Sequence, residues 1–247
     1  MIRVRGLRKV YPGGTVGLDG IDLELATGEF VALIGPSGAG KSTFLRCLNG
    51  LVTPTAGEIS VGGVAVTGAT AHELRRVRAS VGFVFQQFNL LRRLSVLENV
   101  LLGRLARVPT LRSLLALFPE ADVTRAQGVL ERVGLQGLGD RRVDTLSGGQ
   151  QQRVAIARAL VQEPQVLLAD EPMASLDPAL SQTVLALLRR ISEEDGLTVV
   201  TSLHVLGLAR LYGRRVVGVR AGRIAYDGPP EGLTDAVAER IFASRAA

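Results

Sequence analysis

The sequence is poor in several residue types, and each shortage narrows what the protein can be. It has a single cysteine, Cys47, among 247 residues, so no disulfide can form within the chain. Aromatic residues make up only 4%, which argues against the row of stacking side chains that single-stranded nucleic acid requires. No run approaches the ~18 apolar residues of a membrane-spanning helix, and the N-terminus lacks the apolar segment of a signal peptide. We therefore expect a soluble, cytoplasmic protein.

Lysine is almost absent, although the chain is basic. Of 29 basic residues only two, Lys9 and Lys41, are lysines, and the formal net charge is +6. A basic balance favours nucleic acid or anionic lipid as a partner. The arginines, however, are scattered as doublets instead of forming one long run, which is typical of a solvated surface. We therefore expect no nucleic-acid partner.

Lys41 lies inside a stretch that matches a phosphate-binding loop. The stretch follows the strand-like run Phe30–Ile34 and precedes a helical pattern, which is the context that such a loop requires. Glycines let the backbone curl so that its N–H groups point at a phosphate chain, and the helix N-terminus adds partial positive charge. The lysine can reach the β and γ phosphates, and the serine after it can ligate Mg²⁺. The predicted nucleotide contacts are Gly35, Pro36, Ser37, Gly38, Ala39, Gly40, Lys41, Ser42 and Thr43.

Two adjacent carboxylates end a second strand-like run. Residues 166–169 are continuously apolar, as expected of a strand buried in a parallel sheet, and Asp170 and Glu171 follow directly. Because neighbouring residues of a strand point to opposite sides, the two acids can take different roles. Beside a P-loop, Asp170 is predicted to hold Mg²⁺, and Glu171 is predicted to act as the general base on the attacking water.

Four further features are weaker evidence for a nucleotide site when each is taken alone. Tyr11 lies before a glycine turn and is either a base-stacking aromatic or a half-buried residue at a strand end. Gln86 ends a strand with a neutral amide that can ligate a metal or position a water. Residues 147–150 begin a helix with a serine and two glycines, which offers a second anion site. His204 ends another strand and is either a ligand contact at that edge or a turn histidine bonded to the backbone.

The order of the patterns predicts an α/β fold in a single domain. Residues 2–34 alternate and turn like antiparallel strands. Residues 88–160 are helical in pattern, and we interpret them as a helical subdomain inserted between strands. The flanking ranges, 1–87 and 161–247, are predicted to supply an N-terminal antiparallel β subdomain and the core sheet with its helices. All 247 residues are therefore assigned to one domain.

Two prolines, Pro109 and Pro119, break the helical region into pieces. Between them lies the apolar segment 111–118, which is either part of the core or a surface for a protein partner. Ser95, with Glu98 three residues on, is predicted to cap the helix that precedes these prolines.

Taken together, these motifs resemble the ATPase subunit of an ATP-binding cassette (ABC) transporter over nearly the whole chain. The sequence Leu-Ser-Gly-Gly-Gln distinguishes this family from other P-loop families, which lack it upstream of the acidic strand. The resemblance implies a P-loop NTPase (RecA-like) core with ATP and Mg²⁺ as cofactors. The remaining matches, in chain order, are the A-loop aromatic Tyr11, the Q-loop Gln86, the signature residues Leu146, Ser147, Gly148, Gly149 and Gln150, the catalytic Glu171, the D-loop residues 174–177 and the switch residue His204.

The family implies a head-to-tail dimer of cassettes. Each ATP then lies between the P-loop of one copy and the signature residues Ser147, Gly148 and Gly149 of the other, which explains why one chain carries two anion sites. In this arrangement His204 bonds the γ-phosphate, Gln86 links Mg²⁺ and water to the helical subdomain, and Asp177 bridges the two copies. The implied metal contacts are Ser42, Gln86 and Asp170, and the implied catalytic residues are Lys41, Glu171 and His204.

The resemblance also implies partners and a location. An integral membrane permease would hold the chain at the cytoplasmic face of the inner membrane, and a solute-binding protein would act through that permease. The stretches 85–91, 113–119 and 169–178 are similar to the phosphonate importer ATPases, which implies uptake of phosphonate or a related phosphorus oxyanion.

Two alternative functions stay open. A non-transport cassette ATPase acting on nucleic acid or the ribosome usually carries coiled-coil insertions or two fused cassettes, and a monomeric P-loop kinase or switch leaves the signature motif without a role.

Overall fold

A central sheet of six strands carries the loops that matter for function. The structure is a computed structural model that describes residues 1–107, 118–174 and 176–243. The strand order is β10-β9-β3-β8-β7-β6, and every neighbouring pair is parallel except β10 with β9. The strands are β3 (Phe30–Ile34), β6 (Val81–Val84), β7 (Val166–Ala169), β8 (Thr198–Leu203), β9 (Arg215–Arg220) and β10 (Arg223–Gly228).

Four strands of this sheet are buried on both faces. Every residue of β3, β6, β7 and β8 is buried, which is the reason for their continuous apolar sequence. The expectation of antiparallel strands over residues 2–34 is therefore wrong for β3, which pairs in parallel with β8 and β9. A strand covered on both sides belongs inside a parallel sheet, whereas an alternating strand can leave one face in water.

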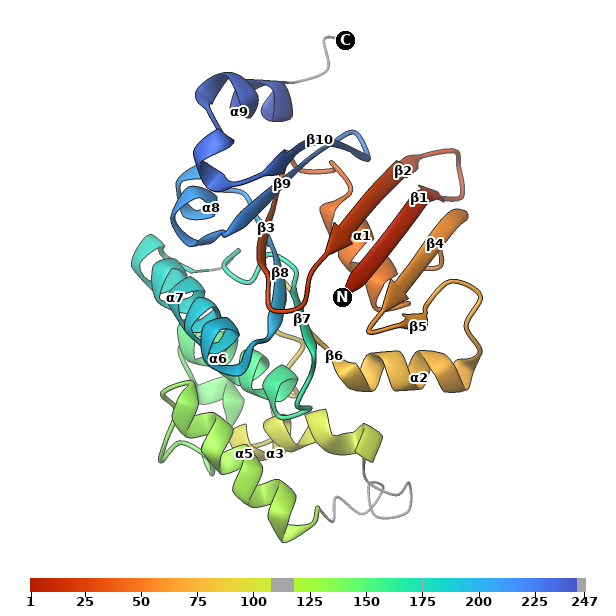
Figure 1. The fold of residues 1–247 in the computed structure, drawn as a ribbon. Coiled ribbons are helices and arrows are strands. Elements are labelled where there is room, and N and C mark those ends of the chain that lie inside the picture. The colour runs from red at the N-terminus through yellow and green to blue at the C-terminus, as the bar shows by residue number, and fades with distance from the viewer. Residues whose placement is uncertain (108–117, 175, 244–247) are drawn as a thin grey trace.

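A second, antiparallel sheet confirms the rest of that expectation. Its order is β2-β1-β4-β5, formed by β1 (Ile2–Val10), β2 (Val16–Leu25), β4 (Ala56–Val61) and β5 (Val64–Ala65). The buried side chains of β1, β2 and β4 pack in one cluster with α1 (Lys41–Leu48) and with residues of the central sheet. The P-loop helix thus lies between the two sheets (Figure 1).

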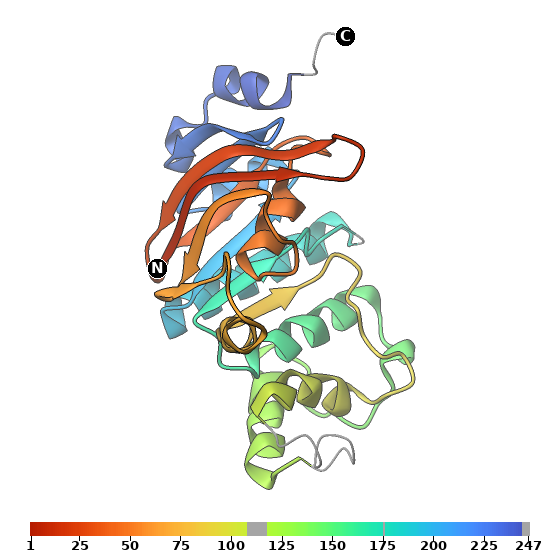
Figure 2. The same cartoon turned by 90° about the vertical axis from the view of Figure 1, so that its right-hand side faces the viewer.

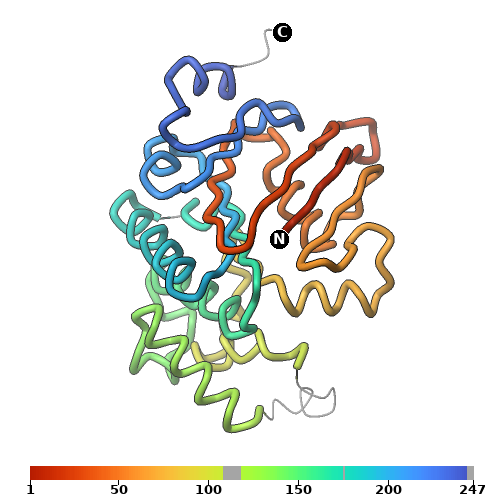
Figure 3. The backbone as a smooth tube through the Cα atoms, in the orientation of Figure 1, coloured from red at the N-terminus to blue at the C-terminus, as the bar shows by residue number. Residues whose placement is uncertain are grey.

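The chain leaves the central sheet after β6 and returns to it with β7 (Figure 3). The described helices between these strands are α3 (Val96–Leu101), η1 (Leu102–Arg107), α5 (Glu120–Arg132), η2 (Val143–Thr145) and α6 (Gly148–Leu160). Ser95 caps α3 as predicted, since it accepts from the Glu98 N–H while the Glu98 carboxylate accepts from the Ser95 N–H.

The remaining helices cover the other parts of the molecule. They are α2 (Ala71–Ser80), α7 (Pro178–Asp195), α8 (Leu206–Tyr212), η3 (Pro230–Gly232) and α9 (Asp235–Phe242). Both side views place α5 at one end of the molecule and α9 at the opposite end, with the sheets between them (Figures 1 and 2). None of the helices in the described ranges is long and apolar enough to cross a membrane.

Two sequence expectations fall where the structure gives no description. The apolar segment 111–118 lies outside the described residues except for Phe118, which packs against a core cluster that joins α3, α5 and α6 to the central sheet and α7. Ser175, in the D-loop stretch, also lies outside them.

Candidate nucleotide site

The P-loop after β3 has a backbone that only glycine can adopt at two positions. Gly35 has φ 151° and Gly40 has φ 108°, and side chains rarely tolerate such angles. A Cβ atom at Gly35 would lie 2.1 Å from the Val219 carbonyl oxygen, and one at Gly40 would lie 2.3 Å from the Gly17 carbonyl oxygen. The loop is therefore held tightly against β9 and β2, with α1 beginning at Lys41.

Lys41 points back into the loop from the first turn of α1. It is 4% exposed, and its Nζ donates to the carbonyl oxygens of Gly35 at 2.7 Å and Pro36 at 3.0 Å. An ammonium has three donors, so one remains for a ligand oxygen. Burial lowers the pKa of Lys41, against the opposing charges of Glu171 and Asp170. Lys41 is thus hydrogen-bonded to the loop in which it is predicted to bind phosphate.

The hydroxyl of Ser42 meets the carboxylate of Asp170, although 128 positions separate them. Ser42 Oγ donates to Asp170 Oδ1 at 2.7 Å, and Asp170 is fully buried at the end of β7. The second oxygen, Oδ2, accepts from Arg46 on α1 at 3.3 Å. The buried carboxylate is therefore paired with both a hydroxyl and a guanidinium, as a buried charge requires.

The donor chemistry of Ser42 and Asp170 fits Mg²⁺. A hydroxyl oxygen and one carboxylate oxygen are hard ligands, and Mg²⁺ in nucleotide sites keeps several waters and phosphate oxygens besides. Within the described ranges, no group of three or more His, Cys, Asp or Glu residues gathers to form an all-protein cage. A magnesium ion would thus be held by these two residues together with nucleotide and water, with Gln86 as the predicted third contact.

Glu171 sits at the centre of a second cluster. Its backbone is in the left-handed region at φ 48°, which is uncommon for a residue with a side chain. Its N–H donates to Ser202 Oγ at 2.8 Å. Its carboxylate accepts from Gln86 Nε2 at 2.9 Å and lies against His204 Nε2. A cavity of about 640 Å³ opens beside these side chains.

His204 has a side-chain partner at the end of β8, and its contact with a ligand stays a prediction. The imidazole Nε2 contacts Glu171 Oε1, and the ring is partly exposed to the cavity. The structure thus brings the predicted residues Gln86, Glu171 and His204 into contact. Ser42 and Asp170 join the same cluster through Ser202.

Tyr11 is the half-buried residue at a strand end that one alternative expects, and its stacking on a base stays a prediction. It is half-buried at the end of β1, and its hydroxyl bonds Thr43 Oγ1 at 3.0 Å. Lys9 Nζ lies 5.3 Å from the centroid of the Tyr11 ring, which is within cation–π range. The tyrosine is therefore fixed beside the last residue of the P-loop stretch.

The signature residues lie outside this cluster. Ser147 caps α6, with its hydroxyl accepting from the Gln150 N–H at 3.4 Å and the Gln150 side chain accepting from the Ser147 N–H at 3.0 Å. A Cβ atom at Gly149 would lie 3.2 Å from Leu180 on α7. In the described part of the chain, no hydrogen bond joins residues 147–150 to the P-loop. The two predicted anion sites of one protomer are thus separate.

Asp177 has a structural task within its own protomer. Its Oδ1 accepts from the N–H groups of Ala179 at 3.0 Å and Leu180 at 2.9 Å, so it is the N-cap of α7. Its Oδ2 has no hydrogen-bond partner in the part of the chain that the structure describes, and the contact between copies stays a prediction.

Two residues of the site were missed at the sequence level: Arg46 and Ser202. Arg46 was one of 27 arginines, and nothing in its spacing marks it as the partner of Asp170. Ser202 carried a weak signal, because a hydroxyl inside a strand buried on both faces usually has a hydrogen-bond partner.

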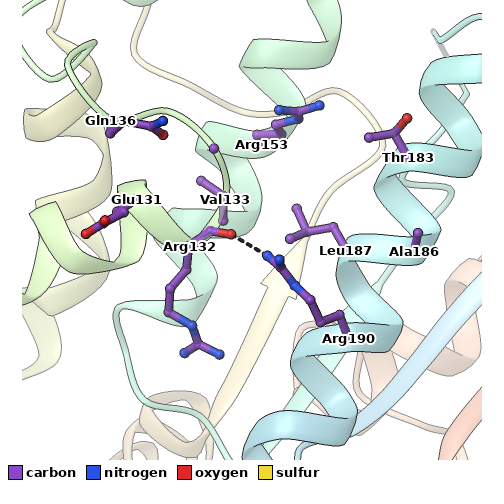
Figure 4. A pocket seen from close by; sticks show the side chains of 10 residues that line it. Glu131, Arg132, Val133, Gln136, Arg153, Thr183, Ala186, Leu187 and Arg190 are labelled. Carbon is purple, nitrogen blue, oxygen red and sulfur yellow. Dashed lines mark hydrogen bonds between the residues drawn. The ribbon is translucent and has the colours of Figure 1, made fainter.

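A separate cleft of about 390 Å³ lies between α5, α6 and α7 (Figure 4). Arg190 reaches across it from α7 and donates to the carbonyl oxygen of Arg132 at 2.7 Å, and Arg153 of α6 borders the same space. None of the predicted site residues lines this cleft. It is therefore distinct from the cluster at the ends of β6, β7 and β8.

Comparisons with known proteins agree with this geometry. The family model described as ABC transporter matches residues 18–174. Phosphonates import ATP-binding protein PhnC 2 of Halalkalibacterium halodurans is 49% identical over 242 residues, covering 98% of this chain and 99% of that protein. Phosphonates import ATP-binding protein PhnC of Thiobacillus denitrificans is 50% identical over 241 residues, covering 98% of this chain and 92% of that protein.

Solved structures show the same fold. A bacterial ABC transporter cassette solved as a dimer superposes with a TM-score of 0.83 at 36% identity, covering 93% of this chain and 99% of that chain. An ATP-binding cassette in its ADP conformation gives a TM-score of 0.85 at 27% identity, covering 99% of each chain. The fold and the loop after β3 define a P-loop nucleotide-binding protein. The chain belongs to the ABC transporter family, as the cassette that binds ATP and couples its hydrolysis to transport.

Proposed function

We propose that this chain powers the uptake of phosphonate, or a related phosphorus oxyanion, through a separate membrane permease. The similarity to phosphonates import ATP-binding proteins along almost the whole length of both chains supports the choice of solute. The solute itself would contact the permease and a solute-binding protein. The chain would lie at the cytoplasmic face of the inner membrane, bound to the permease.

The hydrogen-bonded cluster supports a division of labour among the site residues. Lys41 and the P-loop N–H groups hold the phosphates, and Ser42 and Asp170 hold the Mg²⁺ that balances phosphate charge. Glu171 takes a proton from the attacking water, because its carboxylate faces the cavity at the strand ends. His204 positions the γ-phosphate from the other side of Glu171. Tyr11 stacks on the base beside Thr43.

One observation carries the dimer part of the proposal. The P-loop cluster and residues 147–150 are two predicted anion-binding segments that no hydrogen bond joins among the described residues of one protomer. The N–H groups of Gly148 and Gly149 have no acceptor within those residues, and such a helix N-terminus is suited to phosphate. Two copies arranged head to tail would place Ser147, Gly148 and Gly149 of one against the nucleotide of the other, with Asp177 near the contact.

We propose that the helical subdomain 88–160 links hydrolysis to the permease. Gln86 lies where the chain leaves β6 for these helices, and it is bonded directly to Glu171. A movement of the helices relative to the sheet would therefore change the contacts of the catalytic carboxylate. ATP would close the dimer, and hydrolysis would open it.

The test is reconstitution in proteoliposomes with the permease and solute-binding protein encoded by neighbouring genes. We expect uptake of radiolabelled methylphosphonate that needs ATP and is lost with Glu171→Gln. If another solute were taken up and methylphosphonate were not, the choice of solute would be wrong, but the transport function would stand. Co-purification of the chain with nucleic acid and not with membranes would contradict transport itself and favour a non-transport cassette.

A further inference from the structure

Ser202 connects the two acidic residues of the site. It is fully buried in β8, the strand that lies between β3 and β7 in the sheet. Ala169 pairs with Thr201 across β7 and β8, so the next residues on each strand, Asp170 and Ser202, come level with one another. Ser202 Oγ donates to Asp170 Oδ1 at 3.2 Å and accepts from the Glu171 N–H at 2.8 Å.

One hydroxyl satisfies both contacts at once. A serine hydroxyl has one proton to donate and lone pairs to accept, so neither bond excludes the other. The accepted bond comes from the N–H of Glu171, whose backbone has φ 48°. This conformation costs free energy and persists only where the surrounding structure holds it. The direction of the Glu171 side chain, towards Gln86 and His204, follows from that backbone. The donated bond helps to orient the oxygen that also accepts from Ser42.

We propose that Ser202 is a positioning residue for ATP hydrolysis. Through one hydroxyl it fixes the backbone of the general base, Glu171, and the orientation of the Mg²⁺-holding carboxylate, Asp170. Its side chain is fully buried, and its hydroxyl acts through its bonds to these two residues. The inference rests on the roles proposed above for Asp170 and Glu171.

The neighbouring residue supplies a matched control. Thr201 is also fully buried in β8, but its Oγ1 has no hydrogen-bond partner among the described residues. Thr201→Val therefore removes a buried hydroxyl without breaking a bond, whereas Ser202→Ala removes one that makes two bonds. The pair separates the effect of the bonds from the effect of altering a buried strand.

The experiment compares Ser202→Ala, Ser202→Thr, Ser202→Val and Thr201→Val. We expect Ser202→Ala to lower kcat for ATP about 10- to 100-fold, the usual effect of removing a partner of a metal-holding residue. The KM for ATP and the affinity for a fluorescent nucleotide without Mg²⁺ should stay within about twofold of the wild-type values, since the P-loop is untouched. The Mg²⁺ concentration needed to saturate the fluorescence change should rise about tenfold.

The threonine and valine variants distinguish bonding from packing. They have the same size, so only the hydroxyl differs, and we expect Ser202→Thr to be at least about tenfold faster than Ser202→Val. Equal kcat in these two variants, or a Ser202→Ala kcat within about twofold of the wild-type value, overturns the inference. Thr201→Val should have the kcat of the wild type. A fall in its kcat as large as that of Ser202→Ala would also overturn the inference.

Glu171→Gln, measured in parallel, separates this inference from the roles on which it rests. If Glu171→Gln abolishes hydrolysis while Ser202→Ala does not impair it, only the role of Ser202 is wrong. If Glu171→Gln turns over at the wild-type rate, the assignment of the general base is wrong, and the inference is overturned with it.

Discussion

Gln86 Nε2 donates to Glu171 Oε2 across 2.9 Å, which joins the residue at the start of the helical region to the predicted general base. The two residues are 85 positions apart and follow neighbouring strands, β6 and β7. This hydrogen bond connects the segment that leads into the helical region directly to the predicted general base. We expect a displacement of that segment to change the position of the Glu171 carboxylate.

Replacing Gln86 tests that connection. Gln86→Ala removes the donor to Glu171, and we expect kcat to fall about tenfold or more, since hydrogen bonds to charged groups are worth roughly 1.5–3 kcal/mol. The matched control is Gln87→Ala, because Gln87 is also exposed and its side chain makes no hydrogen bond to the described residues. ATP hydrolysis with and without the permease is the measurement. Equal effects of the two variants would contradict a special role for Gln86.

Lys41 should determine nucleotide affinity. Lys41→Ala removes an ammonium that is predicted to contact phosphate, and we expect the Kd of a fluorescent ATP analogue to rise about 10- to 100-fold. Lys41→Arg should not restore binding, because a planar guanidinium does not match the compact ammonium that donates to the Gly35 and Pro36 carbonyl oxygens. Wild-type affinity in Lys41→Ala would exclude the P-loop role.

A buried ion pair should stabilise the helical region. Arg104 Nε donates to Asp122 Oδ1 at 2.8 Å, and both residues are buried, at 6% and 7% exposure. Asp122→Ala leaves the guanidinium bonded to Glu163 and the Val161 carbonyl oxygen alone, so we expect a loss of about 2 kcal/mol in the free energy of unfolding, the contribution of one hydrogen bond between charged groups.

The control for Asp122→Ala is the surface pair Arg210–Asp235, where the Asp235 side chain is 92% exposed. Asp235→Ala should cost less than about 1 kcal/mol in urea unfolding. Similar losses in the two variants would contradict a special contribution of the buried pair.

The single cysteine should make stability fall at high pH. Burial raises the pKa of the Cys47 thiol from 9.0 to about 11, against the opposing charge of Lys9. The folded state therefore holds this proton more tightly than the unfolded state, so the contribution is present below pH 9 and is lost as pH rises towards 11. At pH of about 10 the loss should be about 1 kcal/mol.

Cys47→Ala isolates this effect from other groups that titrate in the same range. The difference in unfolding free energy between wild type and variant should shrink between pH values of about 8 and 10. A constant difference across that range would show that the thiol does not ionise as described.

The residues at the strand ends could be predicted from the sequence because each motif is recognisable from a few consecutive residues. A buried apolar run followed at once by Asp170 and Glu171, or by a glycine loop and Lys41, has few other interpretations. Ser202 and Arg46 could not be assigned in this way, since their partners depend on the order of strands in the sheet. Only when β8 lies between β3 and β7 does Ser202 meet Asp170. The parallel pairing of β3 was likewise a property of the whole sheet.

The signature segment shows a different limit. Residues 147–150 were predicted from their motif, and the structure explains their local form as a capped helix start. The ligand proposed for the Gly148 and Gly149 N–H groups lies on a second copy, so their role depends on the dimer and not on contacts within one protomer. Ser147→Arg should leave ATP binding by a single chain intact and abolish dimerisation, since bulk and positive charge would enter the contact. Size-exclusion chromatography in ATP is the measurement, and a surviving dimer would contradict the head-to-tail arrangement.

The central claim is that two copies enclose ATP between them. Light scattering coupled to size-exclusion chromatography of Glu171→Gln, with ATP and Mg²⁺, tests it most directly, because the amide keeps the shape of the side chain and removes the base. The account predicts a particle of twice the 26.2 kDa of one chain that returns to single chains when ATP is removed. Single chains that bind ATP but stay apart at every concentration, even with the permease present, would contradict it.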